Sequence, residues 1–262
     1  MTTPIMLIFF AFFLFGSLCL MCIFRDKLDS PFINRLFTIL TLAFYFSWTY
    51  AGSLLGWTKS GFLTMQNISP FVCTIVVILP LMRKPLRDFA YASIAYLSVG
   101  MSLALFLSPL ANYLFEMKKE ATFVYASEAA CHLIMALYGF YLFLRGRVKV
   151  DLLDFKRAAL FIYSAVGVGV VCNYFFKMSN FGMDMHGNYA IYSLKLFDNF
   201  GATLAAYLLG IFGVLCMGYI AGHFLTKLGN KKAETTIEPT EEAEPTEEPT
   251  AEAVCDVTEE IV

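Results

Sequence analysis

Three residues able to do chemistry stand inside long apolar stretches of this chain: Cys73, Glu128 and His132. Glu128 and His132 are one helical turn apart. Counted from the outer ends of their predicted helices, Cys73 and His132 differ in depth by only about 3 Å. A nearby histidine can take the proton of a thiol, and a third group can orient the imidazole. The spacing therefore allows a nucleophilic Cys73–His132 pair, oriented by Glu128 or Asn173.

The same residues have plainer interpretations. A cysteine in a membrane helix is commonly an apolar filler. A histidine one turn from a carboxylate also suits a proton relay or a polar contact between helices. Spacing alone leaves these alternatives open.

Further polar side chains gather in the predicted outer half of the bundle. Gln66, Ser69 and Cys73 share one helix face at i, i+3, i+7 spacing. Gln66 and Ser69 belong to a larger set of residues that we expect to bind substrate: Gln66, Asn67, Ser69, Asn173 and Asp198. Aromatic residues in the second apolar stretch predict an interfacial belt instead: Tyr45, Trp48, Tyr50 and Trp57.

The elements that must position these residues are helices of membrane-spanning length. The chain is 58% hydrophobic and only 15% charged, a balance typical of membrane helix bundles. Seven apolar runs each reach about the 20 residues that cross a bilayer core: 5–24, 36–57, 60–82, 89–115, 121–144, 158–176 and 199–225. Glycines in the last two runs predict close helix packing: Gly167, Gly169, Gly210, Gly213 and Gly218. We expect an all-α membrane protein, a bundle of seven transmembrane helices.

The distribution of Lys and Arg predicts the orientation of this bundle. Fourteen of them follow the first, third, fifth and seventh runs, against five on the opposite side. The positive-inside rule then places the N-terminus outside and the C-terminus in the cytoplasm of a multi-pass cell-membrane protein. The first run lacks a preceding positive charge, so we expect an uncleaved helix.

The chain changes character after residue 228. Residues 229–262 carry two basic and eleven acidic side chains and repeat a Glu-Pro-Thr unit. Proline and repelling glutamates predict a disordered cytoplasmic tail after a membrane domain of residues 1–228. The basic residues before the tail suit anionic lipid rather than nucleic acid, so membrane lipids are the expected partners. A protein partner of the tail is not identified.

Several established site motifs are absent from the sequence. It contains no G-x-x-x-x-G-K-[ST], H-E-x-x-H or G-x-S-x-G. The last apolar run has no lysine for a retinal Schiff base, and Asp184 with His186 would under-coordinate a metal. We expect no cofactor and no metal site.

Three short segments resemble the bacterial YwaF-like family of integral membrane proteins: ISPFVCTIVVILPL (68–81), CHLIMALYGFYLF (131–143) and GNYAIY (187–192). That family is distantly similar to a vertebrate transmembrane lipid acyltransferase that uses a cysteine and a histidine. The resemblance implies that Cys73 and His132 are catalytic, and it adds Asn188, of an Asn-Tyr pair, to the substrate-binding residues. It favours a lipid acyltransferase or acyl hydrolase. The alternative is a binding or transport protein with an outward-facing pocket for a small polar solute.

Overall fold

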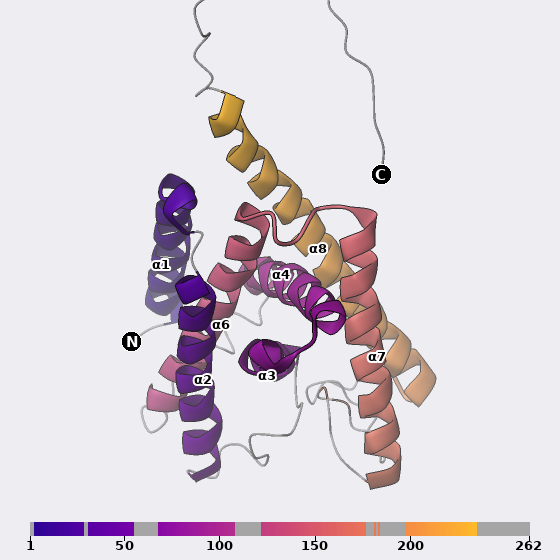
Figure 1. Ribbon diagram of the computed structural model, residues 1–262. Coiled ribbons are helices and arrows are strands. Elements are labelled where there is room, and N and C mark those ends of the chain that lie inside the picture. The colour runs from indigo at the N-terminus through magenta and orange to yellow at the C-terminus, as the bar shows by residue number, and fades with distance from the viewer. Residues whose placement is uncertain are drawn as a thin grey trace, which may run out of the picture.

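All the regular secondary structure of the described residues is helical (Figure 1). The computed structural model describes residues 3–28, 31–54, 68–107, 122–176, 181, 183 and 197–234. Within them lie seven α-helices and no strand: α1 (Thr3–Ile23), α2 (Pro31–Leu54), α3 (Ile68–Ile78), α4 (Lys84–Leu107), α6 (Thr122–Leu144), α7 (Leu152–Phe176) and α8 (Phe200–Glu234). Two short 3-10 helices, η1 (Arg25–Leu28) and η2 (Leu79–Leu81), follow α1 and α3. The predicted all-helical class is confirmed for these residues.

Three of the described helices are long and apolar enough to cross a membrane. They are α6 over Ala126–Leu144, α7 over Leu152–Phe176 and α8 over Phe200–Lys227. Phe10–Ile23 and Ile68–Leu81 form shorter apolar helices. The outer parts of the second, third and fourth predicted spans lie outside the described residues, so a count of seven spans stays a prediction.

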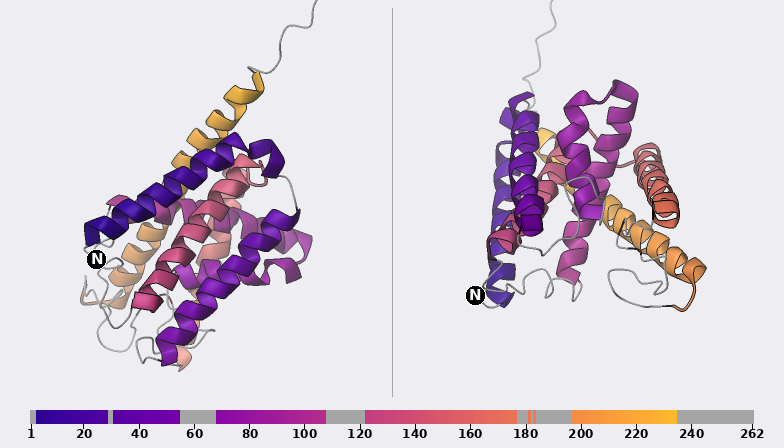
Figure 2. Two further views of the ribbon diagram at one scale, coloured as in Figure 1. Left: turned by 90° about the vertical axis from the view of Figure 1, so that its left-hand side faces the viewer. Right: turned by 90° about the horizontal axis from the view of Figure 1, so that it is seen from below.

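Helix α4 is the centre of the bundle. In Figures 1 and 2, α1 and α2 lie on one side of α4 and α6, with α7 and α8 on the other. The most extensive helix contacts join α4 to α8, α6 and α7, and α2 to α6. The middle of α4 is completely enclosed, since Ile94, Tyr96, Leu97 and Val99 have no exposed surface.

Two glycines allow α4 and α8 to approach closely. A Cβ built on Gly218 would meet the backbone of Tyr96, and one on Gly100 would meet the backbone of Val214. The predicted packing role is therefore confirmed at Gly218. It is wrong for the three predicted glycines that have no neighbouring atom within 4 Å of such a Cβ: Gly167, Gly210 and Gly213. Gly169 is buried on α7.

The outer surface of the helices is strongly apolar. Phe12 on α1, Phe176 on α7 and Leu209 on α8 are 71%, 72% and 70% exposed. The apolar windows of α7 and α8 are each only 22% buried, against 67% for α6. Exposed apolar surface on this scale marks a lipid or protein contact surface, and it is compatible with a membrane location.

Helix α8 extends further than the sequence predicted. It continues to Glu234, so residues 229–234, assigned above to the disordered tail, are helical. The segment Lys231–Glu234 contains lysine, alanine and glutamate, which favour helix, and this outweighs the single Gly229. Residues 235–262 lie outside the described part of the chain.

Candidate functional site

A serine and a histidine meet between α3 and α6. Ser69 Oγ lies 2.9 Å from His132 Nε2. One turn further along α3, Cys73 Sγ lies 3.4 Å from Met135 Sδ, three residues after His132. Because both pairings advance in the same direction, α3 and α6 run parallel, as the predicted topology requires. Pro70 follows Ser69 in the first described turn of α3, where its missing N–H is tolerated.

The second nitrogen of His132 defines the proton arrangement of this pair. His132 Nδ1 lies 2.8 Å from the backbone carbonyl oxygen of Glu128. A carbonyl oxygen only accepts hydrogen bonds, so Nδ1 carries the proton and donates it. In the neutral imidazole Nε2 is then an acceptor, and the Ser69 hydroxyl donates to it. This is the proton arrangement of a general base poised over a hydroxyl group.

Glu128 therefore orients His132 through its backbone and not through the predicted carboxylate. The carbonyl of residue i−4 lies within reach of a histidine at position i because of helix geometry. The Glu128 side chain is partly buried. Its backbone role would survive a change of side chain at position 128.

Cys73 occupies a buried sulfur cluster beside the serine–histidine pair. Its side chain has no exposed surface, whereas Ser69 and His132 are both partly exposed. In addition to its contact with Met135, it is electrostatically coupled to the neighbouring Cys131 thiol. In the described part of the chain, His132 Nε2 is paired with Ser69 and not with Cys73. Ser69 therefore keeps some exposed surface, whereas Cys73 has none.

Aromatic side chains of α2 line the site. The rings of Trp48 and His132 lie 6.0 Å apart, and Tyr45 packs against Trp48 at the same distance. The Thr74 hydroxyl also lies 3.5 Å from Tyr45 OH. Tyr45 and Trp48 are buried, so the predicted interfacial belt is wrong for them, whereas Tyr50 is exposed. The helical spacing of polar residues on α3 and α6 did not predict that α2 also lines the site.

Another of the predicted binding residues has a structural task. Asn173 on α7 is fully buried, and its Nδ2 donates to the backbone oxygen of Met183 at 3.4 Å. Phe181, with a φ of 56°, is buried, and its ring centre lies 5.8 Å from that of Phe71 on α3. Asn173 thus ties the segment after α7 to the bundle.

The remaining predicted residues do not join the pair in the described structure. Asp198 is exposed just before α8. Gln66, Asn67 and Asn188, together with Trp57, lie outside the described residues. Within the residues that the structure describes, no three His, Cys, Asp or Glu side chains are grouped to hold a metal ion.

No protein-family model, curated protein or solved structure matches this chain. The resemblance to the YwaF-like family therefore stays a prediction, and the functional argument depends on the geometry of the site.

Proposed function

We propose that this chain is a membrane-embedded lipid acyltransferase or acyl hydrolase in which His132 activates Ser69. The observation that carries the proposal is the 2.9 Å contact between Ser69 Oγ and an imidazole whose other nitrogen is held by a backbone carbonyl. It keeps the reaction class expected from the sequence and assigns the attack to Ser69 instead of Cys73. The exposed apolar faces of α7 and α8 supply the lipid contact that such a substrate needs.

The reaction would proceed in two balanced steps. Ser69 Oγ bonds to the ester carbonyl carbon while His132 Nε2 takes the hydroxyl proton. The ester C–O bond then breaks, and Nε2 returns that proton to the departing alcohol oxygen. Water or a second lipid alcohol next attacks the Ser69 ester, with Nε2 taking its proton and returning it to Oγ. The Glu128 carbonyl holds the charged imidazole through Nδ1 in both steps.

A fluorophosphonate probe, which reacts with activated serines, tests this assignment on the full chain in lipid nanodiscs. We expect labelling of the wild type, none of Ser69→Ala, and labelling slower by about 10²–10⁴-fold in His132→Gln, the usual contribution of a general base. Ser102→Ala is the matched control, because the buried Ser102 hydroxyl donates to the Ser98 carbonyl of its own helix. Equal labelling of Ser69→Ala and wild type would remove Ser69 from the mechanism.

The stability of an acyl adduct separates the serine from the cysteine. After incubation with phospholipid, neutral hydroxylamine releases a thioester on Cys73, whereas an oxygen ester on Ser69 needs alkaline hydroxylamine. We expect an adduct of the second kind, retained in Cys73→Ala. A thioester on Cys73 would return the attack to the cysteine. Absence of any adduct, with unchanged biological activity in Ser69→Ala, would favour the polar-solute pocket.

A further inference from the structure

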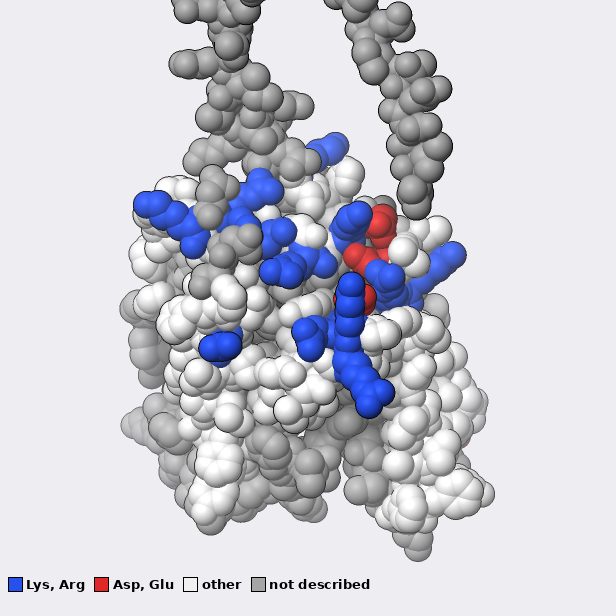
Figure 3. Space-filling model, viewed as in Figure 1, with Lys and Arg blue, Asp and Glu red and all other residues white. Residues whose placement is uncertain are grey.

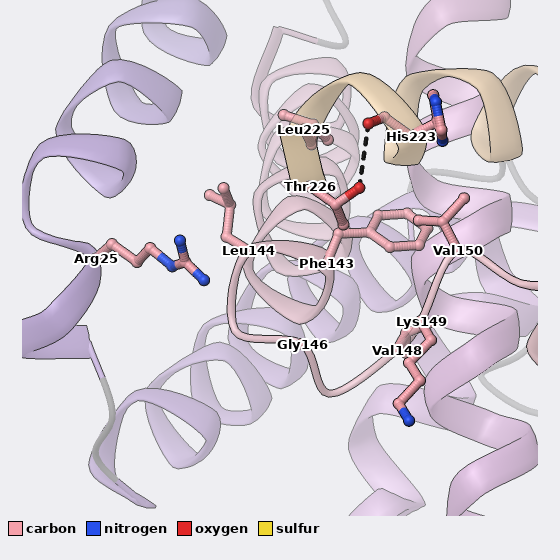
Figure 4. Close-up of a pocket in the computed structure, with 10 residues that line it drawn as sticks. All are labelled: Arg25, Phe143, Leu144, Gly146, Val148, Lys149, Val150, His223, Leu225 and Thr226. Carbon is pink, nitrogen blue, oxygen red and sulfur yellow. Dashed lines mark hydrogen bonds between the residues drawn. The ribbon is translucent and has the colours of Figure 1, made fainter. Parts of the chain in front are cut away.

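A second site lies at the other end of α6, away from the serine–histidine pair. A cavity of about 270 Å³ opens between the C-terminal ends of α6 and α8, η1 and the loop that leads to α7 (Figure 4). Three of its lining residues are basic or titratable: Arg25, Lys149 and His223. Others form apolar walls, among them Phe143, Val150 and Leu225.

The loop that carries Lys149 is held in place by buried groups. The Lys149 backbone N–H donates to Asp154 Oδ2 at 2.8 Å, and its carbonyl accepts from Tyr96 OH at 2.9 Å. Gly146, with a φ of +61°, allows the turn that brings this loop back over α6. The exposed Lys149 side chain is therefore mounted on a fixed backbone.

Arg25 is positioned by a neighbouring arginine. Arg145 Nη1 donates to the Arg25 carbonyl oxygen at 3.0 Å, which links η1 to the end of α6. Figure 4 shows the Arg25 side chain extended from η1 toward the cavity residues of α6. A basic residue with a fixed backbone therefore stands on each of two sides of the cavity, and Figure 4 shows the Lys149 side chain pointing away from Arg25.

Of the two acidic residues beside this loop, Asp154 is neutralised by an ion pair with Arg157. Asp154 accepts from Arg157 at 2.6 Å and from the Lys149 backbone, and Asp151 Oδ1 accepts from the Asp154 N–H. Both Asp154 oxygens and Asp151 Oδ1 therefore fix the loop, and Asp151 keeps its negative charge. Figure 3 shows Lys and Arg side chains gathered over this end of the molecule.

We propose that this cavity binds the head group of an anionic phospholipid. The phosphate would bind the Arg25 guanidinium, and the exposed Lys149 side chain would turn toward it. The glycerol and first acyl carbons would lie against Phe143, Val150 and Leu225. Free phosphate would gain nothing from these apolar walls, whereas a lipid matches both parts of the cavity. Arg25 and Lys149 also lie in segments that the charge bias predicts to be cytoplasmic, where anionic lipids concentrate.

The test uses the full chain in detergent with phosphatidylglycerol or phosphatidylcholine, and native mass spectrometry to count bound lipid. We expect retention of phosphatidylglycerol over phosphatidylcholine. Each cation near a membrane surface changes binding about fivefold, so Arg25→Gln with Lys149→Gln should weaken retention by roughly 25-fold. The charge-matched control is Arg83→Gln with Lys84→Gln, two exposed basic residues that do not line the cavity.

Two results would overturn the proposal. Equal loss in the control pair would show diffuse surface attraction, and full displacement of the lipid by inorganic phosphate would show a simple anion site. A photoreactive phosphatidylglycerol on the unmodified protein gives a reading that does not depend on variant folding. We expect crosslinks on peptides around Arg25 and Val148–Val150; crosslinks confined to other segments would contradict the site.

Discussion

Replacing Gly218 by alanine should loosen the contact between α4 and α8, the most extensive helix pair of the described bundle. A Cβ at Gly218 would stand 2.9 Å from the Tyr96 carbonyl carbon and 3.0 Å from its Cα. Carbon atoms pack best at about 3.5–4.0 Å, and the Tyr96 carbonyl oxygen stands closer still, so the two helices must separate by about 1 Å or more. The opposing atoms are backbone, and no side-chain rotation can relieve the overlap.

The size of the effect follows from two opposing contributions. Overpacking a helix contact costs about 1–3 kcal/mol, and the rigid backbone places this position at the upper end. Alanine favours helix over glycine by about 1 kcal/mol, so the net loss is about 2 kcal/mol. Gly210→Ala, on the same helix with no atom within 4 Å, should instead gain about 1 kcal/mol. The two variants should therefore differ by about 3 kcal/mol.

Thermal unfolding in detergent, followed by circular dichroism, measures this difference. At about 2–4 °C per kcal/mol for a domain of this size, the midpoints should lie roughly 6–12 °C apart, with Gly218→Ala the lower. Gly100→Ala, facing the Val214 backbone, should behave like Gly218→Ala. A Gly218→Ala protein as stable as Gly210→Ala would refute the close crossing of α4 and α8.

Three further predictions test other parts of the molecule. Asp154→Asn should weaken the hydrogen bonds of the Asp154 side chain, including the one to the Lys149 N–H, and so free the loop that carries Lys149. We expect the free energy of unfolding to fall by about 1–2 kcal/mol in the same assay. An unchanged midpoint would show that Asp154 does not fix this loop. Oxidation should form a disulfide between Cys73 and Cys131, because the two thiols are neighbours. Mass spectrometry should show the loss of two hydrogens, and Cys131→Ser should abolish this bond. Absence of the bond in the wild type after complete oxidation would contradict the pairing of α3 with α6. Truncation after Glu234 should leave the bundle inserted and monodisperse on size exclusion, because the removed acidic segment has little apolar surface to bury, and aggregation would count against this.

Helix positions were largely predictable because hydropathy and length determine them. The predicted run 121–144 coincides with α6 (Thr122–Leu144), and the run 5–24 with α1 (Thr3–Ile23). The end of α8 was missed, because polar helix formers after Leu228 continue a helix that hydropathy alone would end.

The partner of His132 was not predictable from the sequence. Ser69 and Cys73 share a face of α3, and about 6 Å in axial position separates them. A depth argument with an error of a few ångströms cannot choose between two such neighbours. The axial shift of α3 against α6 is set by side-chain packing, which places Met135 and Cys131 beside Cys73 and leaves His132 beside Ser69. The contribution of Trp48 also depends on how α2 packs against α6, and not on any local pattern.

The enclosed position of α4 has a consequence for biogenesis. Its main packing partners, α6, α7 and α8, are all synthesised after it. Until they emerge from the ribosome, the enclosed surface of α4, which includes Ser93 and Ser98, has only the earlier helices of the chain to pack against. Helix α8 thus completes the burial of a helix made much earlier, and a nascent chain that stops before α8 leaves one face of α4 uncovered.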